Sequence, residues 1–366
     1  MQNRAAVIGA GVSGLTCGVV FAEREWNVTI LADETSQQTT SAAAAAVWFP
    51  YDTEPAEKII PWALTTYEWL RDLSRDSLTG VSMIEIRQFT RTGTIPIPDW
   101  AKNLGACRIP SQVGAIDPIA RERPSGSDRF GETPLPFPSR GSAWIFASGY
   151  ALTVPLTDTT IYLDYLTDRF RKAGGMIQST HINKVEDIPS DFDLIINCAG
   201  MGARELVHDP DLEPHRGQVA IVSKLDLTPA IVCDDAPLMY AIPRANDCVF
   251  GGTNSLSNSR EPSPADTDAI VSECSRILRI EAPRVTAVKV GLRPFRKSGV
   301  RLAPEKLPDG RTIIHNYGHG GAGFTLSWAC AEEVYAIASG LSTVSNETQI
   351  KGTDVTLSRG LRHRLV

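Results

Sequence analysis

The sequence predicts an α/β protein, built either as two domains or as one large unit with an insertion. Its N-terminal part reads as a strand, a glycine-rich turn, a helix and a second strand, which together form a βαβ unit. A later segment, "FDLIINCAG", is a continuous apolar strand of the kind that parallel sheets bury. The chain has 366 residues, which is more than one simple core usually holds.

The composition argues against several classes of protein. A net charge of -6 disfavours a nucleic-acid partner, because phosphate binding needs a basic surface. Without an uninterrupted apolar run of about 20 residues, the sequence predicts no membrane span. The seven cysteines include no CxxC pair, so we expect reduced thiols in a cytoplasmic protein. No cluster of His, Asp or Glu has metal-ligand spacing, and we expect no bound metal.

The N-terminal βαβ unit contains a dinucleotide-binding motif. Residues Ala5–Ile8 form the first strand, Leu15–Arg24 the helix, and "NVTILADE" the second strand. The intervening "GAGVSG" has the spacing of the phosphate-binding turn in Rossmann-like domains, and it lies between a strand and a helix as that turn requires. The motif predicts a dinucleotide, but it does not distinguish FAD from NAD.

The glycines of this turn have separate tasks. Gly9 permits the tight turn, Gly11 lets the backbone approach a pyrophosphate, and Gly14 lets the helix and the strand pack closely. The pyrophosphate then lies at the positive end of the helix dipole. Asp33, at the end of the second strand, is the acidic candidate for the ribose hydroxyls, and Glu34 is its competitor.

The rest of the chain alternates helical and strand-like patterns around one irregular stretch. Residues 99–140 are rich in Pro, Gly and Ser, and such a long stretch usually covers a site or is partly mobile. The predicted helices are Pro61–Leu73, "IYLDYLTDRFRKAGG", Asp266–Ile280 and a closing helix that ends at about Ser339. The predicted strands lie in residues 217–252, "TAVKVGLRPF" and "RTIIHNYG". The tail, residues 341–366, is polar and is expected to fray.

A second glycine cluster, in "HNYGHGGAGFTLSWACAEEV", favours FAD over NAD. A nicotinamide enzyme does not need a second glycine-rich turn between a strand and a helix near its C-terminus. An extended flavin does, because its ring system must be held at the far end from the adenine. The helix that begins near Gly323 can face the pyrimidine edge of the ring, where a reduced flavin is negative, and Thr325 could donate to the same edge.

Several segments occur together in a characteristic order and spacing: "VIGAGVSGL", "TTSAAAAAVWFPY", "HRGQV", "YAIPR", "VGLRPFR", "RL" and "HNYGHGGAGFTLSW". With them the chain resembles the D-amino-acid oxidase family from residue 5 to about residue 335. The resemblance implies a discontinuous Rossmann-like FAD-binding domain from residues 1–50, 156–208 and 300–340. It implies a second, α+β domain for the substrate, residues 51–155 and 209–299, built on a mixed β-sheet.

The resemblance also implies a reaction. FAD oxidises a D-amino acid to an imino acid by taking the α-hydrogen as hydride at N5, and O2 reoxidises the flavin to give H2O2. The imino acid hydrolyses to a 2-oxo acid and ammonia. This mechanism needs positioning and desolvation more than acids and bases, so we assign no proton transfer to His315 or His319.

Three residues match the family's substrate site. Arg293 pairs with the substrate carboxylate, since a planar guanidinium gives bidentate recognition. The hydroxyl of Tyr240 contacts the same carboxylate, and the backbone carbonyl of Gly321 accepts from the substrate amine. Where the family often has a bulky lid residue, this chain has Ala236, Pro237 and Leu238, which leaves the shape of the pocket lid open.

The cofactor residues implied by the turn and by the resemblance cover the whole length of FAD. The segment Thr39–Ser41 contacts the phosphates, the small side chains of Ala42–Val47 pass close to the flavin, and the backbone of Val185 holds the adenine. Without the resemblance, the alanine run would be interpreted as helix. The full set is Gly9, Gly11, Val12, Ser13, Gly14, Asp33, Thr39, Thr40, Ser41, Val47, Val185, Gly320, Ala322, Gly323, Phe324 and Thr325.

Several rival functions stay open at this point. A relative acting on glycine, sarcosine or another secondary amine would share the flavin architecture. A D-aspartate oxidase would need a further cation in the pocket, for which Arg244 and Arg296 are candidates. A flavoprotein dehydrogenase that avoids O2, or a flavin-binding protein without oxidase activity, is a third rival. The expected partners are a small amino-acid substrate and O2, and the sequence is compatible with a homodimer.

Overall fold

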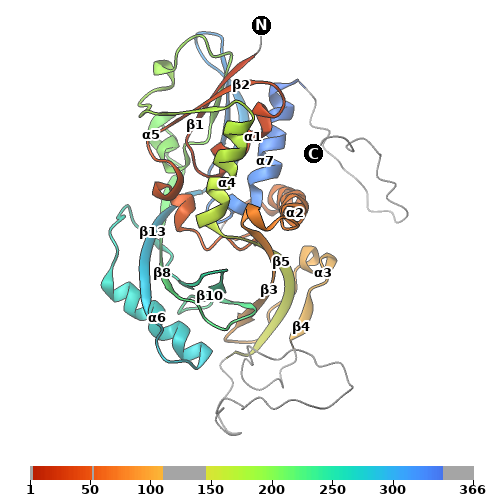
Figure 1. Cartoon of the computed structure of the whole chain (residues 1–366), viewed down its shortest axis with the longest axis vertical. Helices are drawn as coiled ribbons and strands as arrows, with labels where there is room; N and C mark the ends of the chain where they lie inside the picture. Colours follow the sequence, from red (N-terminus) through yellow and green to blue (C-terminus); the bar gives the residue numbers. More distant parts are fainter. Residues whose placement is uncertain (1–2, 52, 110–145, 341–366) are drawn as a thin grey trace, which may run out of the picture.

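The computed structural model describes residues 3–51, 53–109 and 146–340, and it has the predicted α/β architecture (Figure 1). A six-stranded sheet forms the upper part in Figure 1, in the order β14-β15-β7-β1-β2-β6. All neighbouring strands are parallel except β14, which runs antiparallel to β15. The strands are β1 (Arg4–Ile8), β2 (Asn27–Ala32), β6 (Met176–Ser179), β7 (Leu194–Asn197), β14 (Arg301–Lys306) and β15 (Thr312–Tyr317).

Helices α1 (Val12–Ala22), α4 (Thr159–Lys172) and α7 (Gly323–Ala338) pack together on this sheet. Nearly every side chain of α1 is buried because α4 and α7 contact it from two sides. The carboxylate of Asp158 caps α4 by accepting from the backbone of Thr160, and basic residues fill the last turn. Gly174, at φ 88°, then ends the helix, as the glycine pair in the sequence predicts.

Helix α2 (Ala56–Leu73) packs against α7 although it lies outside the predicted cofactor-binding ranges. The rings of Trp69 and Trp328 stack with centroids 4.7 Å apart, and the backbone N–H of Ala329 donates to the Thr66 hydroxyl. The helix begins five residues before the predicted start because Pro61 is accommodated inside it. Within the described residues, no helix is both long and apolar enough to cross a bilayer.

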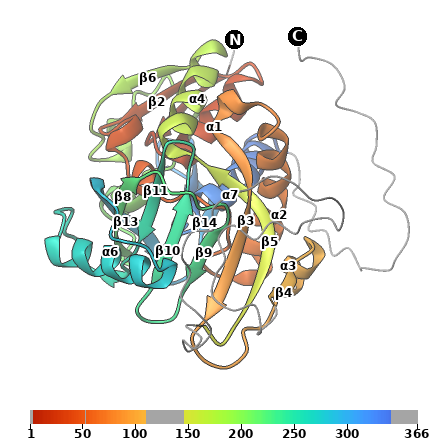
Figure 2. The same cartoon turned by 60° about the horizontal axis from the view of Figure 1, so that its bottom comes forward.

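A nine-stranded mixed sheet forms the lower part in Figure 1, and it confirms the expected mixed β-sheet (Figures 1 and 2). Its order is β12-β8-β11-β10-β9-β3-β5-β4, and β13 also pairs with β8. The β3–β9 pair is parallel and the other pairs are antiparallel. The strands are β3 (Val81–Thr90), β4 (Cys107–Ile109), β5 (Ser148–Thr157), β8 (Leu212–Ser223), β9 (Ala230–Cys233), β10 (Met239–Pro243), β11 (Asp247–Gly251), β12 (Ser255–Leu256) and β13 (Val285–Arg296).

Helix α6 (Pro264–Leu278) packs against β8, β10 and β11 and is capped by the hydroxyl of Ser263 (Figure 2). Two short helices complete the set, α3 (Asp99–Asn103) and α5 (Ala203–Leu206). Helix α3 and strand β4 lie in the stretch that was expected to be irregular, and its continuation from residue 110 lies outside the described residues, as does the tail from residue 341. Single 3-10 turns occur at Ser36–Gln38, Thr40–Ala43, Ser77–Thr79, Val185–Asp187 and Gly200–Gly202.

Candidate active site

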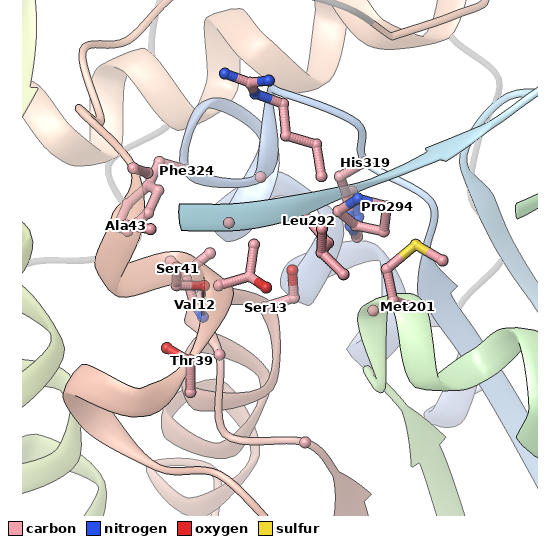
Figure 3. Close-up of a pocket in the computed structure, with 18 of the residues that line it drawn as sticks. Val12, Ser13, Thr39, Ser41, Ala43, Met201, Leu292, Pro294, His319 and Phe324 are labelled. Atoms are coloured by element: carbon pink, nitrogen blue, oxygen red, sulfur yellow. Dashed lines mark hydrogen bonds between the residues drawn. The ribbon is translucent and has the colours of Figure 1, made fainter. Parts of the chain in front are cut away.

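A cavity of about 630 Å³ is lined by residues of both sheets. Its walls begin at the carboxyl ends of β1 and β2, pass the N-termini of α1 and α7, and reach β10 and β13. The close-up in Figure 3 shows Val12, Ser13, Thr39 and Ser41 together on one side, and Met201, Pro294 and His319 together on another. The long, continuous cavity therefore joins the predicted cofactor site to the predicted substrate site.

The βαβ turn at one end of the cavity needs its glycines for space. A Cβ atom on Gly9, whose φ is 97°, would lie 2.6 Å from the carbonyl oxygen of Cys198. A Cβ atom on Gly14 would lie 1.9 Å from the carbonyl oxygen of Gly9. Gly14 therefore lets α1 pack directly on the turn, as predicted, and it does not itself line the cavity.

The N-terminus of α1 faces the cavity beside the segment Thr39–Ser41. The backbone N–H of Val12 donates to the Ser41 hydroxyl at 3.0 Å, and a Cβ atom on Gly11 would lie 3.0 Å from the same oxygen. The Thr39 hydroxyl donates to the carbonyl of Ser36 at 2.9 Å. Amide groups at a helix N-terminus, with hydroxyls beside them, make a site that suits a diphosphate.

Two carboxylates lie at the outer end of this region. Asp33 Oδ2 contacts Nδ1 of His181 at 3.0 Å, and Glu34 forms an ion pair with Arg260. All four residues line the cavity. Because Arg260 already holds Glu34, Asp33 stays the better candidate for a ribose hydroxyl.

The second glycine cluster forms the turn into α7, whose first residue lies beside the α1 N-terminus: a Cβ atom on Gly323 would lie 3.6 Å from Cγ1 of Val12. Gly320, Gly321, Gly323, Phe324 and Thr325 all line the cavity. The first N–H groups of α7 have no intrahelical partner and are available to an electronegative ring edge. This is the place where the sequence predicted the flavin ring.

The Thr325 side chain differs from the prediction that it donates to the flavin. Its hydroxyl donates to the carbonyl of Phe49 at 3.0 Å and accepts from the backbone N–H of Phe49 at 3.1 Å. The hydroxyl proton is therefore already used to hold the segment after the alanine run. Any donation from Thr325 to a cofactor must come from its backbone N–H.

Two further predicted cofactor residues, Val185 and Ala322, do not line the cavity. Val185 is buried in an apolar cluster, while the preceding residues Thr180, His181, Ile182 and Asn183 line the cavity. Ala322 is fully buried, and its N–H donates to the carbonyl of His319 at 2.9 Å, which closes the turn before α7. Apart from Gly14, the other predicted cofactor residues, including Thr40 and Val47, lie in the wall.

The alanine run forms the wall as irregular backbone and not as an α-helix, and Ala46 has a φ of 55°. After the 3-10 turn Thr40–Ala43, Ala44 has an extended conformation, and residues 43–47 line the cavity. Trp48 is buried and donates from Nε1 to the carbonyl of Ala63, which fits its expected packing role. Tyr51, which was also expected to be a packing residue, lines the cavity, and its ring lies where a Cβ atom on Gly321 would be.

At the substrate end, Arg293 and Tyr240 come together from separate strands. Arg293 Nη1 donates to the carbonyl of Thr253 at 3.1 Å, and the guanidinium lies within hydrogen-bonding reach of the Tyr240 hydroxyl. Burial raises the pKa of Tyr240, and the charge of Arg293 opposes this rise. The phenol therefore stays protonated at neutral pH and can act as a donor.

Glycines that sequence reasoning missed make room for this pair. A Cβ atom on Gly217 would lie 2.5 Å from Nη2 of Arg293, and one on Gly251 would lie 1.9 Å from Cζ of Tyr240. A Cβ atom on Gly252 would lie 2.7 Å from the Tyr240 hydroxyl. The only signal in the sequence is that these glycines interrupt strand-like runs, in "HRGQV" and "CVFGGT".

Neither histidine of the second cluster is set up for proton transfer. His319 lines the cavity, but burial lowers its pKa to about 4, and its Nε2 contacts Asn316 Oδ1 at 3.0 Å. His315 does not line the cavity and contacts Asn197 and Glu305. Among the described residues, no group of three His, Cys, Asp or Glu side chains is arranged to hold a metal.

The arrangement fits FAD in four respects. The α1 N-terminus offers a diphosphate site, Asp33 lies where a ribose would follow, and the α7 N-terminus also faces the cavity. A planar ring also needs a wall of small side chains, which Ala43–Ala46 supply.

Comparisons with known proteins agree with this geometry. Residues 4–337 match the family model described as FAD dependent oxidoreductase (DAO). A protein of Rubrobacter xylanophilus named D-amino-acid oxidase is 39% identical, covering 92% of this chain and 95% of that protein. A Streptomyces coelicolor protein of the same name is 35% identical, covering 92% and 97%. The crystal structure of glycine oxidase from Geobacillus kaustophilus aligns with a TM-score of 0.74 at 16% identity, covering 94% and 96%.

The family match spans most of the chain, and the fold, the glycine-rich turn and the cavity have the features that an extended flavin cofactor requires. The chain belongs to the DAO family of FAD-dependent oxidoreductases.

Proposed function

We propose that the protein oxidises D-amino acids to imino acids, which hydrolyse to 2-oxo acids and ammonia, and that O2 is the electron acceptor. The observation that carries the proposal is the meeting of Arg293 and Tyr240 at the substrate end of the cavity. The names of the two relatives at 39% and 35% identity support the same substrate class.

Arg293 and Tyr240 bind the substrate carboxylate in this proposal. A guanidinium and a phenol that donate to one carboxylate fix its position and plane, and the α-carbon is fixed with it. The carbonyl of Gly321, on the turn before α7, accepts from the amine. Two substituents of the α-carbon, the carboxylate and the amine, are fixed in this way. The position of these contacts relative to the bound cofactor would then decide which enantiomer presents its α-hydrogen.

The cofactor would be held by the residues of the two glycine-rich turns. Val12, Ser41 and their neighbours hold the diphosphate, Asp33 the ribose, and the α7 N-terminus the pyrimidine edge. Bound FAD supplies the acceptor for the hydride of the α-carbon and passes the electrons to O2, which yields H2O2. The protein's own contribution is to align the α-carbon and to exclude water.

The histidines support a mechanism without a protein acid or base. At neutral pH a buried group whose pKa is about 4 is uncharged, so His319 cannot supply a proton from an imidazolium. The amine must then enter in its neutral form or lose its proton to solvent before the hydride leaves.

The structure argues against a D-aspartate oxidase, which would need a second cation near the substrate. Arg244 is buried and paired with Asp247 and Asp158, and Arg296 is paired with Asp209. Neither arginine lines the cavity.

Experiment must separate three rival functions from this one: oxidation of glycine or a secondary amine, a flavoprotein dehydrogenase, and flavin binding without oxidase activity. Apolar side chains around Tyr240, namely Ile86, Val232, Leu238 and Ile242, line the cavity and would be unnecessary for glycine. A flavin-binding protein without oxidase activity would not need the clamp that Arg293 and Tyr240 form.

We further propose a cytoplasmic location and the domain division given above. The location is supported by the described cysteines, which are all free and, apart from Cys107, buried. The division is supported by the strands, since the six-stranded and nine-stranded sheets draw on different ranges of the chain. A homodimer stays open, and analytical ultracentrifugation of the holoenzyme would decide it.

Product stoichiometry tests the proposed reaction. The holoenzyme is supplied with D-alanine in air, and O2 consumption, H2O2, ammonia and pyruvate are measured together. The proposal predicts equal initial rates for all four, measured before enough H2O2 accumulates to decarboxylate the pyruvate. Imino-acid products formed with an artificial acceptor but without O2 uptake would instead indicate a dehydrogenase.

A further inference from the structure

One acidic side chain faces the substrate end of the cavity. Asp234 directly follows strand β9 and lines the cavity together with Val232, which lies two residues earlier on the same face of the strand. In the sheet Val232 is paired with Tyr240 of β10. Asp234 is therefore two residues along the chain from the position opposite Tyr240, and its charge contributes, after burial, to the raised pKa of that tyrosine.

The position of Asp234 is fixed by a buried amide. Nε2 of Gln88 donates to Asp234 Oδ2 at 2.7 Å, and Gln88 is itself 3% exposed on strand β3, where it pairs with Val232. The Oε1 atom of Gln88 is buried without a hydrogen-bond partner in the described part of the protein. The amide therefore presents its N–H end to the carboxylate and holds Asp234 in place.

The neighbouring Asp235 has a different role. Its Oδ2 accepts from the Thr90 hydroxyl and from the backbone N–H of Arg91, both at 2.6 Å. It does not line the cavity. Asp235 therefore holds the backbone at Arg91, whereas Asp234 faces the cavity.

Asp234 has no cationic partner among the described residues. The arginines of the cavity wall are Arg293, at the clamp, and Arg260, which pairs with Glu34 at the opposite end. Asp234 is an exposed residue in the cavity wall. Partial desolvation by the surrounding protein raises its pKa, the hydrogen bond from Gln88 opposes this rise, and the charge of Asp235 adds to it. The charge of Asp234 also contributes, after burial, to the raised pKa of Tyr150, about 12. A carboxylate in such surroundings is stabilised when a ligand brings a positive charge.

We propose that Asp234 is a specificity residue that pairs with a positively charged substrate side chain, so that the enzyme prefers basic D-amino acids such as D-lysine. The inference rests on the proposed oxidation of D-amino acids. The apolar Val232 and Leu238, which line the cavity together with Asp234 and Tyr240, can contact the methylene groups of such a side chain.

The test compares D-lysine with D-norleucine, which has the same side chain without the terminal amine. Values of kcat/KM are measured for the wild-type holoenzyme and for Asp234→Asn, Asp234→Glu and Asp235→Asn. The wild type should prefer D-lysine, and the preference should fall about tenfold or more in Asp234→Asn, because one charge-assisted bond is lost. Asp234→Glu should retain part of the preference for D-lysine, and the matched control Asp235→Asn should retain all of it.

Flavin content and melting temperature show whether each variant is folded. If the wild type has a higher kcat/KM for D-norleucine than for D-lysine, the inference is wrong. An unchanged ratio in Asp234→Asn, or an equal change in Asp235→Asn, also overturns it, while oxidation of D-norleucine leaves the proposed function standing. Failure of the wild type to oxidise any D-amino acid would instead refute the proposed function itself.

Discussion

Replacing Gly217 by alanine should damage catalysis while leaving the fold intact. The added Cβ atom would lie 2.5 Å from Nη2 of Arg293 and 2.6 Å from its Cζ and Nη1, whereas ordinary contact begins at 3.4 Å. The guanidinium must therefore retreat by about 1 Å. It can do so because it is the end of a flexible side chain, so the cost to stability is small.

The cost to activity is larger because the guanidinium positions the α-carbon. A displacement of about 1 Å in a positioning group can reduce the rate about 100-fold. We therefore expect kcat/KM for a D-amino acid to fall about 100-fold, or about 2.7 kcal/mol, with unchanged flavin content.

The assay is steady-state kinetics with D-alanine, beside thermal unfolding and flavin absorbance of the same preparations. Gly202→Ala is the matched control, because its Cβ atom would meet nothing closer than 3.6 Å and its φ of -61° suits alanine. A Gly217→Ala enzyme with kcat/KM within threefold of the wild type, on the order of the scatter between preparations, would refute the assignment of Arg293 as the clamp.

Three further substitutions test other parts of the site. Arg293→Leu removes the bidentate pair and should lower kcat/KM by several kcal/mol of transition-state binding; a loss of less than about tenfold would exclude the clamp role. Thr325→Val removes both bonds to Phe49 and should lower the free energy of unfolding in urea by about 1–3 kcal/mol, whereas an unchanged value would show that Phe49 finds other partners. The folded-state pKa of His319, about 4, lies below its unfolded value, so the stability that the neutral ring provides is present above about pH 6.5 and is lost as the pH falls towards 4. Between neutral pH and about pH 5, the free energy of unfolding should fall by about 2 kcal/mol more in the wild type than in His319→Gln. If the two proteins lose stability in parallel as the pH falls, this account is wrong.

Local patterns were sufficient to predict the two glycine-rich turns in the cofactor half of the protein, but not the alanine run, which they would give as helix. The turn with Gly9, Gly11 and Gly14 is contiguous in sequence, and so is the turn into α7, because each site is made where one strand meets the next helix. Arg293 was predicted through the resemblance, and its neighbours in the structure support that role.

The substrate half depends on strand register, which local patterns do not reveal. Tyr240 faces Val232 on one side and Gly251 on the other, and these pairs join segments that are separate in the sequence. The glycines that make room for the clamp, and the orientation of Asp234 towards the cavity, follow from that register. Strands β3 and β5 were also missed, because β3 lacks a clean alternation of buried and exposed residues and β5 contains Pro155.

The central claim, oxidation of D-amino acids by the flavin, is tested most directly by anaerobic mixing. The purified holoenzyme is mixed with a D-amino acid or with its L-enantiomer, and the flavin absorbance is followed. We predict bleaching by the D-enantiomer and none by the L-enantiomer. A yellow protein that no D-amino acid bleaches would keep the fold but contradict the function, and it would make glycine, secondary amines or a role without oxidase activity the leading explanations.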